Sequence, residues 1–160
     1  MGNLDVEKMN AVWARVTGAP AACAACRTDL PDDAEKIRAF IAEARRLARF
    51  YDALSKKCAV KSARFRCLAA DERRNIKRLQ TAYFILTGDT CAVRGTEAET
   101  DSVLDALREA FIAERDNADA YGRAAIESKS GFAAELFSAL SSREADHAAE
   151  LQSMIAELMN

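Results

Sequence analysis

The sequence predicts an all-α protein, a four-helix bundle preceded by a short additional helix, and three observations point to this fold class. Gly and Pro are scarce, at 6 and 2 of 160 residues, whereas the helix-favouring residues Ala, Glu, Arg and Leu are abundant. Four long segments carry apolar residues at the three-and-four spacing of a helix face, not at the alternation of a strand. Very short breaks join these segments in pairs, which is typical of helical hairpins.

The N-terminal part is expected to lie outside the bundle. Residues 3–16 are predicted to form a short amphipathic helix that ends at Gly18 and Pro20. An Ala- and Cys-rich connector follows, so the expected domains are 1–31, the N-terminal helix and connector, and 32–160, the bundle. Cys23 and Cys26 form a lone Cys-x-x-Cys in a chain with one histidine. We interpret this pair as small apolar connector residues, and a metal or redox role is the less favoured alternative.

The four long helices are expected near residues 33–57, 62–87, 101–128 and 131–159. Residues suited to cap or end them stand at the expected places: Asp32 or Asp33, Ser62, Gly88, and Asp101 or Ser102. The turns at 58–61 and 129–131 are short, so each joins two antiparallel neighbours. The one long connection is 88–100, and spacing alone leaves a simple up-down-up-down bundle open.

The apolar stripe of each long helix is interrupted near its middle by a glutamate: Glu43, Glu72, Glu114 and Glu144. An unpaired buried carboxylate is costly, so such positions usually hold paired or metal-bound groups. Helix rise puts the glutamates of each hairpin at similar heights, about 21 and 15 Å from the first turn and about 21 and 20 Å from the second. Glu43 precedes Glu114 by 71 positions and Glu72 precedes Glu144 by 72, which indicates a repeated hairpin.

These residues match a known ligand set. Two helices with one glutamate each, and two with Glu-x-x-His, hold the metal ions of dinuclear iron or manganese carboxylate bundles. The chain fills five of these positions: Glu43, Glu72, Glu114, Glu144 and His147. Asn75 stands where the second histidine belongs, and an amide is a poorer ligand than imidazole, so this ligand is weak or lost. The sequence therefore predicts a lopsided site for one or two ions of iron or manganese.

The segments around these positions resemble the rubrerythrin-like branch of the ferritin-like superfamily. Residues 70–79 resemble the second-helix motif E-x-x-H-A-K-R-L, with Asn75 in place of His. The other helices carry Glu43 with Tyr51, Glu114 with Tyr121, and Arg143 to His147 in the corresponding motifs. The resemblance covers about 33–158, and it implies that 88–100 is a crossover between two parallel helices. Asn117 stands where family members often have a further carboxylate.

The resemblance implies oxidase or peroxidase chemistry of the kind used against oxidative stress. An active protein would be a di-metal oxidoreductase acting on oxygen or peroxide, although no individual catalytic residue is assigned. Because Asn75 and Asn117 depart from the family pattern, a second function stays open. In that alternative the bundle binds one ion or none and has a structural or oligomeric role.

Composition bears on partners and location. A net charge of -2 gives no basis for nucleic-acid binding, and no apolar run is long enough to span a membrane. No signal peptide is visible and the five cysteines are an odd number, so we expect a cytoplasmic protein without a disulfide framework. A homodimer is expected because symmetric pairing is common for such bundles. The redox partner is not identified. Trp13 lies on the apolar stripe of 3–16, which is expected to contact the bundle or, as the alternative, a partner.

Overall fold

The computed structural model describes residues 31–93 and 102–159. The helix predicted over 3–16 and the pair Cys23 and Cys26 lie outside the described residues. The described part contains four helices: α2 (Pro31–Lys57), α3 (Ser62–Thr87), α4 (Val103–Glu127) and α5 (Gly131–Met159). These confirm the predicted all-α four-helix bundle. None of the helices in the described ranges is both long enough and apolar enough to cross a membrane.

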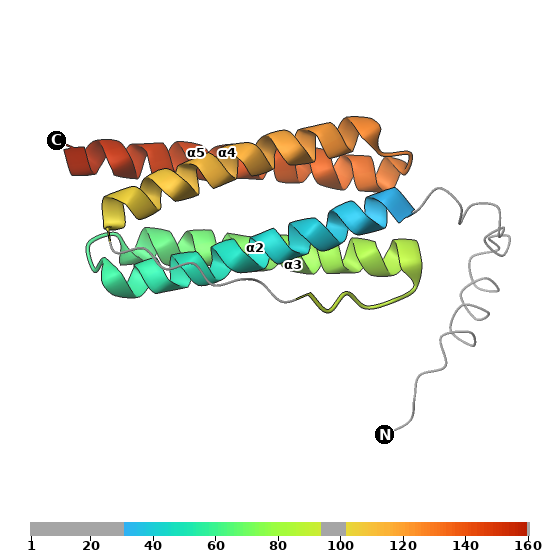
Figure 1. The fold of residues 1–160 in the computed structure, drawn as a ribbon, viewed down its shortest axis with the longest axis horizontal. Helices are drawn as coiled ribbons and strands as arrows, with labels where there is room; N and C mark the ends of the chain where they lie inside the picture. The colour runs from blue at the N-terminus through green and yellow to red at the C-terminus, as the bar shows by residue number, and fades with distance from the viewer. Residues whose placement is uncertain (1–30, 94–101, 160) are drawn as a thin grey trace, which may run out of the picture.

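The four helices form two antiparallel hairpins that pack on each other (Figure 1). Helices α2 and α3 pair closely, as do α4 and α5, while α2 also contacts α4 and α3 contacts α5. Helices α3 and α4 run in the same direction, so α3 ends and α4 begins at opposite ends of the bundle (Figure 1). The connection between them is therefore a crossover, as expected, and the up-down-up-down alternative is wrong.

The start of α2 differs from the prediction. The helix begins at Pro31, so Asp32 and Asp33 lie in its first turn and neither is the capping residue. Proline suits a first helical position, because its fixed φ is helical and its missing N–H has no partner there. The two carboxylates instead face the positive end of the helix dipole. Asp33 is buried and accepts a hydrogen bond of 2.7 Å from Ser128 Oγ, which ties α2 to the turn between α4 and α5.

The start of α3 also differs. The capping position is Lys61, which makes no side-chain cap, and Ser62 is the first helical residue. The Lys61 side chain reaches instead to the carboxylate of Glu157 on α5, at 2.5 Å. An ion pair between the two hairpins thus takes the place of the expected serine cap.

Two other predicted boundaries are confirmed. Gly88 ends α3 with a φ of 77°, and its N–H donates to the carbonyl of Phe84 at 2.8 Å. Positive φ is strained for residues with a Cβ, which explains glycine here. Ser102 caps α4, since its hydroxyl accepts from the N–H of Asp105 at 3.3 Å.

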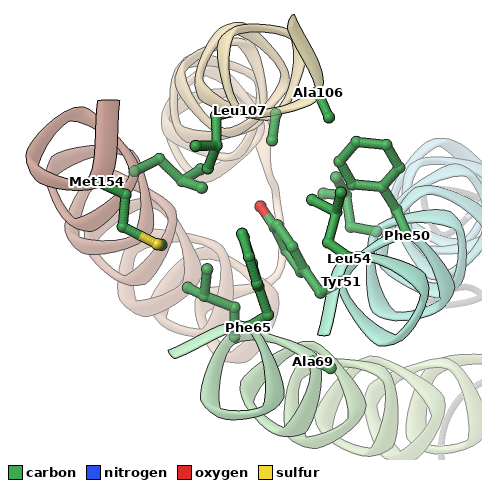
Figure 2. Packing of buried hydrophobic residues seen from close by; sticks show 12 residues of the cluster. Phe50, Tyr51, Leu54, Phe65, Ala69, Ala106, Leu107 and Met154 are labelled. Carbon is green, nitrogen blue, oxygen red and sulfur yellow. The ribbon is translucent and has the colours of Figure 1, made fainter. Parts of the chain in front are cut away.

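The core consists of two apolar clusters, one toward each end of the bundle. Large buried members of the first, drawn in Figure 2, are Leu47, Phe50, Tyr51, Leu54, Phe65, Leu107, Leu151 and Met154. Those of the second are Ile37, Ile41, Leu79, Tyr121, Leu136, Phe137 and Leu140. Burial of each such side chain contributes about 1.5–3 kcal/mol. On α3, α4 and α5 the stretch between the two clusters carries buried polar residues, so a polar layer lies inside the bundle.

Candidate metal centre

Four ionisable side chains form the polar layer: Glu72, Glu114, Glu144 and His147. All four are 3% exposed or less. They come from three helices, α3, α4 and α5. One ligand atom of each lies within 4.8 Å of the corresponding atoms of the other three, so the group could hold a metal ion. The structure thus brings together four of the five residues predicted as metal ligands.

The Nδ1 atom of His147 faces the three carboxylates of the cluster. It is 3.1 Å from Glu72 Oε1, 3.4 Å from Glu144 Oε2 and 3.6 Å from Glu114 Oε1. An imidazole nitrogen can donate a single hydrogen, so it cannot satisfy three carboxylates. The arrangement is that of ligands around a common centre.

Four buried atoms of the cluster have no hydrogen-bond partner, one from each residue: Glu72 Oε1, Glu114 Oε2, Glu144 Oε2 and His147 Nδ1. Leaving a buried polar atom unsatisfied costs about 1–3 kcal/mol, and more when the group is charged. A cation bound among the four side chains would offset the cost of burying these charged and polar groups. Carboxylate oxygens and an imidazole nitrogen are also ligands that first-row transition metals accept, so the residues present fit a metal ion.

Two neighbouring residues hold the other oxygens of the carboxylates. The hydroxyl of Tyr51 donates to Glu114 Oε1, and Figure 2 shows this tyrosine reaching from α2 into the space between the helices. The amide of Asn75 is buried and donates from Nδ2 to Glu144 Oε1 at 3.0 Å. The position where a second histidine was expected therefore faces the cluster, but it carries a hydrogen-bond donor.

Asp71 contacts the outer nitrogen of the histidine ring. Its Oδ2 lies 3.4 Å from His147 Nε2. A carboxylate on the outer nitrogen of a ligating histidine fixes the tautomer and the ring orientation. Here the contact directs Nδ1 of His147 toward the three glutamates. The apolar stripe of α3 does not indicate Asp71, because this residue meets the site through a contact between helices. Its only signal in the sequence is its place directly before Glu72.

Burial and mutual proximity change the acidity of every member of the cluster. Burial raises the pKa of Glu72 to about 7, although the nearby His147 opposes this shift. Burial and the adjacent Glu114 raise the pKa of Glu144 to about 10. Burial acts to lower the pKa of His147, but the three carboxylates outweigh it and raise that pKa to about 12. At neutral pH, the metal-free cluster therefore keeps a proton on Glu144 and a positive charge on His147.

Glu114 differs from the other two glutamates. Burial acts to raise its pKa, but contacts with Glu144 and His147 outweigh burial and lower the pKa below its ordinary value. The Tyr51 hydroxyl acts in the same direction. Glu114 is thus the permanent negative charge of the metal-free cluster.

The structure does not bring Glu43 into the cluster. Its side chain is 33% exposed, and both of its oxygens contact the guanidinium of Arg46, at 2.7 to 3.1 Å. The buried stripe of α2 runs from Ile41 through Ala44 to Leu47, so the expectation that Glu43 interrupts the middle of this stripe is wrong. Glu43 still lies near enough for its charge to contribute to the raised pKa of Glu72. Its role as a metal ligand stays a prediction.

Asn117, the other asparagine at a position expected to face the metal, is half-buried and is not among the four clustered residues.

In comparisons with known proteins, no family model matches the chain, and no curated protein or solved structure matches it either. The geometry of the buried Glu72, Glu114, Glu144 and His147 cluster is therefore the basis for inferring a function.

Proposed function

We propose that this protein is a ferritin-like metal-binding bundle that holds iron or manganese through Glu72, Glu114, Glu144 and His147. The observation that carries the proposal is the convergence of four buried ligand side chains, each of which also has a buried polar atom without a hydrogen-bond partner. A cluster of this kind is costly without a cation and is stabilised by one.

The donor set supports iron or manganese over softer metals. Three carboxylates favour hard cations such as manganese, and an imidazole suits iron, so the mixed set fits these two metals. The three described cysteines, Cys58, Cys67 and Cys91, are not members of the cluster. The soft ion Cu(I), which thiolate and thioether ligands select, is therefore disfavoured.

The surrounding residues support redox use of the site. Bound iron or manganese would supply one-electron chemistry toward dioxygen or peroxide. Tyr51 and Asn75 hold two of the carboxylates by hydrogen bonds, and Asp71 orients the imidazole. The apolar clusters on either side of the site limit the access of water. Ligands held in this way change position little when the charge of the ion changes.

The second candidate is a non-catalytic bundle, and one observation favours it. The Asn75 amide occupies the position of an expected ligand and donates to Glu144. In the metal-free state the raised pKa values keep Glu144 neutral and His147 positively charged at pH 7. The cluster therefore carries less net negative charge than three ionised glutamates would give it. A cluster that partly neutralises itself in this way can serve as a specific polar core without turnover.

Metal analysis separates binding from its absence. The full chain is purified without chelator and then loaded anaerobically with Fe(II) or Mn(II). We expect bound metal in the wild type and its loss in Glu144→Gln and His147→Ala. Glu135→Gln, an exposed glutamate on the same helix, is the matched control and should keep its metal. Metal content near zero in the loaded wild type, or equal content in Glu144→Gln and Glu135→Gln, would contradict the proposal.

Turnover is a separate measurement. The loaded protein should consume peroxide faster than the same concentration of free metal ion. If metal binds at the cluster but peroxide and dioxygen are consumed only at the rate of the free ion, the non-catalytic alternative is correct.

A further inference from the structure

Hydrogen bonds and an ion pair from neighbouring residues hold several carboxylates in and beside the cluster. We infer that the cluster binds a single metal ion per chain, and that Tyr51, Asn75 and Arg46 keep a second ion out. This inference rests on the proposed function, because it concerns the number of ions at the same site.

Glu114 and Glu144 each have only one carboxylate oxygen without a hydrogen-bond partner. A bridging carboxylate uses both of its oxygens, one for each metal. In Glu114, Oε1 accepts from Tyr51 and only Oε2 is without a partner. In Glu144, Oε1 accepts from Asn75 and only Oε2 is without a partner. Each of these carboxylates therefore has one oxygen held by a neighbouring residue and one without a partner, an asymmetry that suits a terminal ligand better than a symmetric bridge.

The distance spanned by the four ligand atoms fits one ion better than two. Bonds from carboxylate or imidazole to zinc, a comparable first-row ion, are about 2.0–2.2 Å, so ligands on opposite sides of one ion are about 4 Å apart. Two ions in a dinuclear site are about 3.5–4 Å apart, which puts the outermost ligands of the pair about 8 Å apart. The four ligand atoms of this cluster all lie within 4.8 Å of one another. This span matches the coordination sphere of one ion.

The residues that a second ion would need as ligands are absent or already paired. The chain has one histidine, so no second imidazole exists. Asn75 stands in the corresponding place, and its amide is committed to Glu144. Of the two carboxylates beside the cluster, Asp71 contacts the outer nitrogen of the histidine ring, and Glu43 is held by the guanidinium of Arg46 through two nitrogens. Binding a second ion would have to break this two-point ion pair and would gain no imidazole in return.

The test is a metal titration of the full-length, metal-free protein with Mn(II) under anaerobic conditions. Stoichiometry is measured by calorimetry and by elemental analysis after gel filtration. We expect one Mn(II) per chain, with the EPR spectrum of an isolated ion. Two ions per chain with the EPR spectrum of a spin-coupled pair would overturn this inference and leave the proposed function intact. No bound Mn(II) or Fe(II) would instead overturn the proposed function.

A gain-of-site variant tests the three residues directly. Arg46→Ala combined with Asn75→His releases Glu43 and supplies the missing imidazole, and Tyr51→Phe added to this pair frees Glu114 Oε1. We expect the triple variant to bind two Mn(II) ions with a coupled spectrum. Its matched control carries Asn75→Ala in place of Asn75→His, and it should stay at one ion. If the folded triple variant also stays at one, these residues do not set the number.

Discussion

Nδ1 of His147 on α5 lies 3.1 Å from Oε1 of Glu72 on α3, an ion pair when the imidazole is protonated, yet neither atom makes a hydrogen bond of acceptable geometry. Buried polar atoms in folded proteins almost always find partners, so two such atoms facing each other require an explanation. Two further oxygens without partners, on Glu114 and Glu144, lie in the same cluster. The interior of the bundle therefore reduces the stability of the metal-free chain and favours a bound cation.

Metal should stabilise the fold. A ligand that binds only the folded state at 100 times its Kd adds about 2.7 kcal/mol of stability. For a chain of this length we expect Tm to rise by about 5–11 °C when Mn(II) or Fe(II) is added to the metal-free protein. Differential scanning calorimetry under anaerobic conditions checks this, with His147→Ala as the control. An equal rise in His147→Ala would place the metal elsewhere.

Replacement of Glu144 or of Glu114 by glutamine should change the stability of the metal-free protein differently. Because the pKa of Glu144 is raised to about 10, this residue is already neutral in the metal-free protein at pH 7. In the unfolded chain Glu144 is ionised at pH 7, so its raised pKa costs stability that a glutamine does not cost. Glu144→Gln should therefore raise the free energy of unfolding of the metal-free protein while it abolishes metal binding. Glu114→Gln removes an ionised partner of Tyr51 and His147, so it should destabilise the metal-free protein by about 1–3 kcal/mol.

Urea denaturation of the metal-free variants at pH 7 measures this difference. Glu135→Gln on α5 is the matched control and should behave as the wild type. If Glu144→Gln destabilised the metal-free protein as much as Glu114→Gln, Glu144 would be ionised there, and our account of the charges would be wrong.

Metal binding should release protons and strengthen as pH rises. At pH 7 the metal-free cluster holds one dissociable proton on His147 and one on Glu144, and Glu72, with a pKa of about 7, is about half protonated. Coordination needs the deprotonated groups, so about two to three protons leave when the metal binds. Affinity should then increase about tenfold per pH unit for each proton released.

Calorimetric titration in buffers of different ionisation enthalpy counts the protons. A binding enthalpy that does not depend on the buffer, together with an affinity that does not depend on pH between 6 and 8, would contradict this prediction.

Asp71 should act on the metal through His147. Asp71→Asn weakens the acceptor on Nε2, and loss of such outer partners typically lowers metal affinity about 10- to 100-fold. The Kd for Mn(II), measured by calorimetry, checks this effect. Asp146→Asn is the control, because Asp146 is exposed on α5 directly before His147. Equal Kd values for Asp71→Asn and Asp146→Asn would show that the ring is oriented by packing alone.

The helical spacing of apolar residues was sufficient to predict the four helices and three of the four carboxylate positions. On α3, α4 and α5 the polar interruption lies on the line of the buried stripe, as Glu72, Glu114 and Glu144 show. On α2 the spacing fits two positions equally well, since Glu43 follows Phe40 by three residues and Ala44 follows Ile41 by three. The buried position is Ala44.

The remaining features depend on contacts between helices, which spacing within one helix cannot predict. Asn75 was identified as a lost ligand, but its hydrogen bond to Glu144 depends on how α3 packs against α5. The contact of Asp71 with His147 has the same origin. Glu43 is satisfied by Arg46 one turn along its own helix, a local pairing that competes with the core.

A crystal structure of the protein loaded with Mn(II), with diffraction data collected on both sides of the manganese absorption edge, tests the central claim most directly. We predict one anomalous peak per chain, within bonding distance of Nδ1 of His147 and of the carboxylates of Glu72, Glu114 and Glu144. The account would be contradicted if these four side chains bound no ion in crystals of the loaded protein, or if the anomalous peak lay elsewhere on the chain.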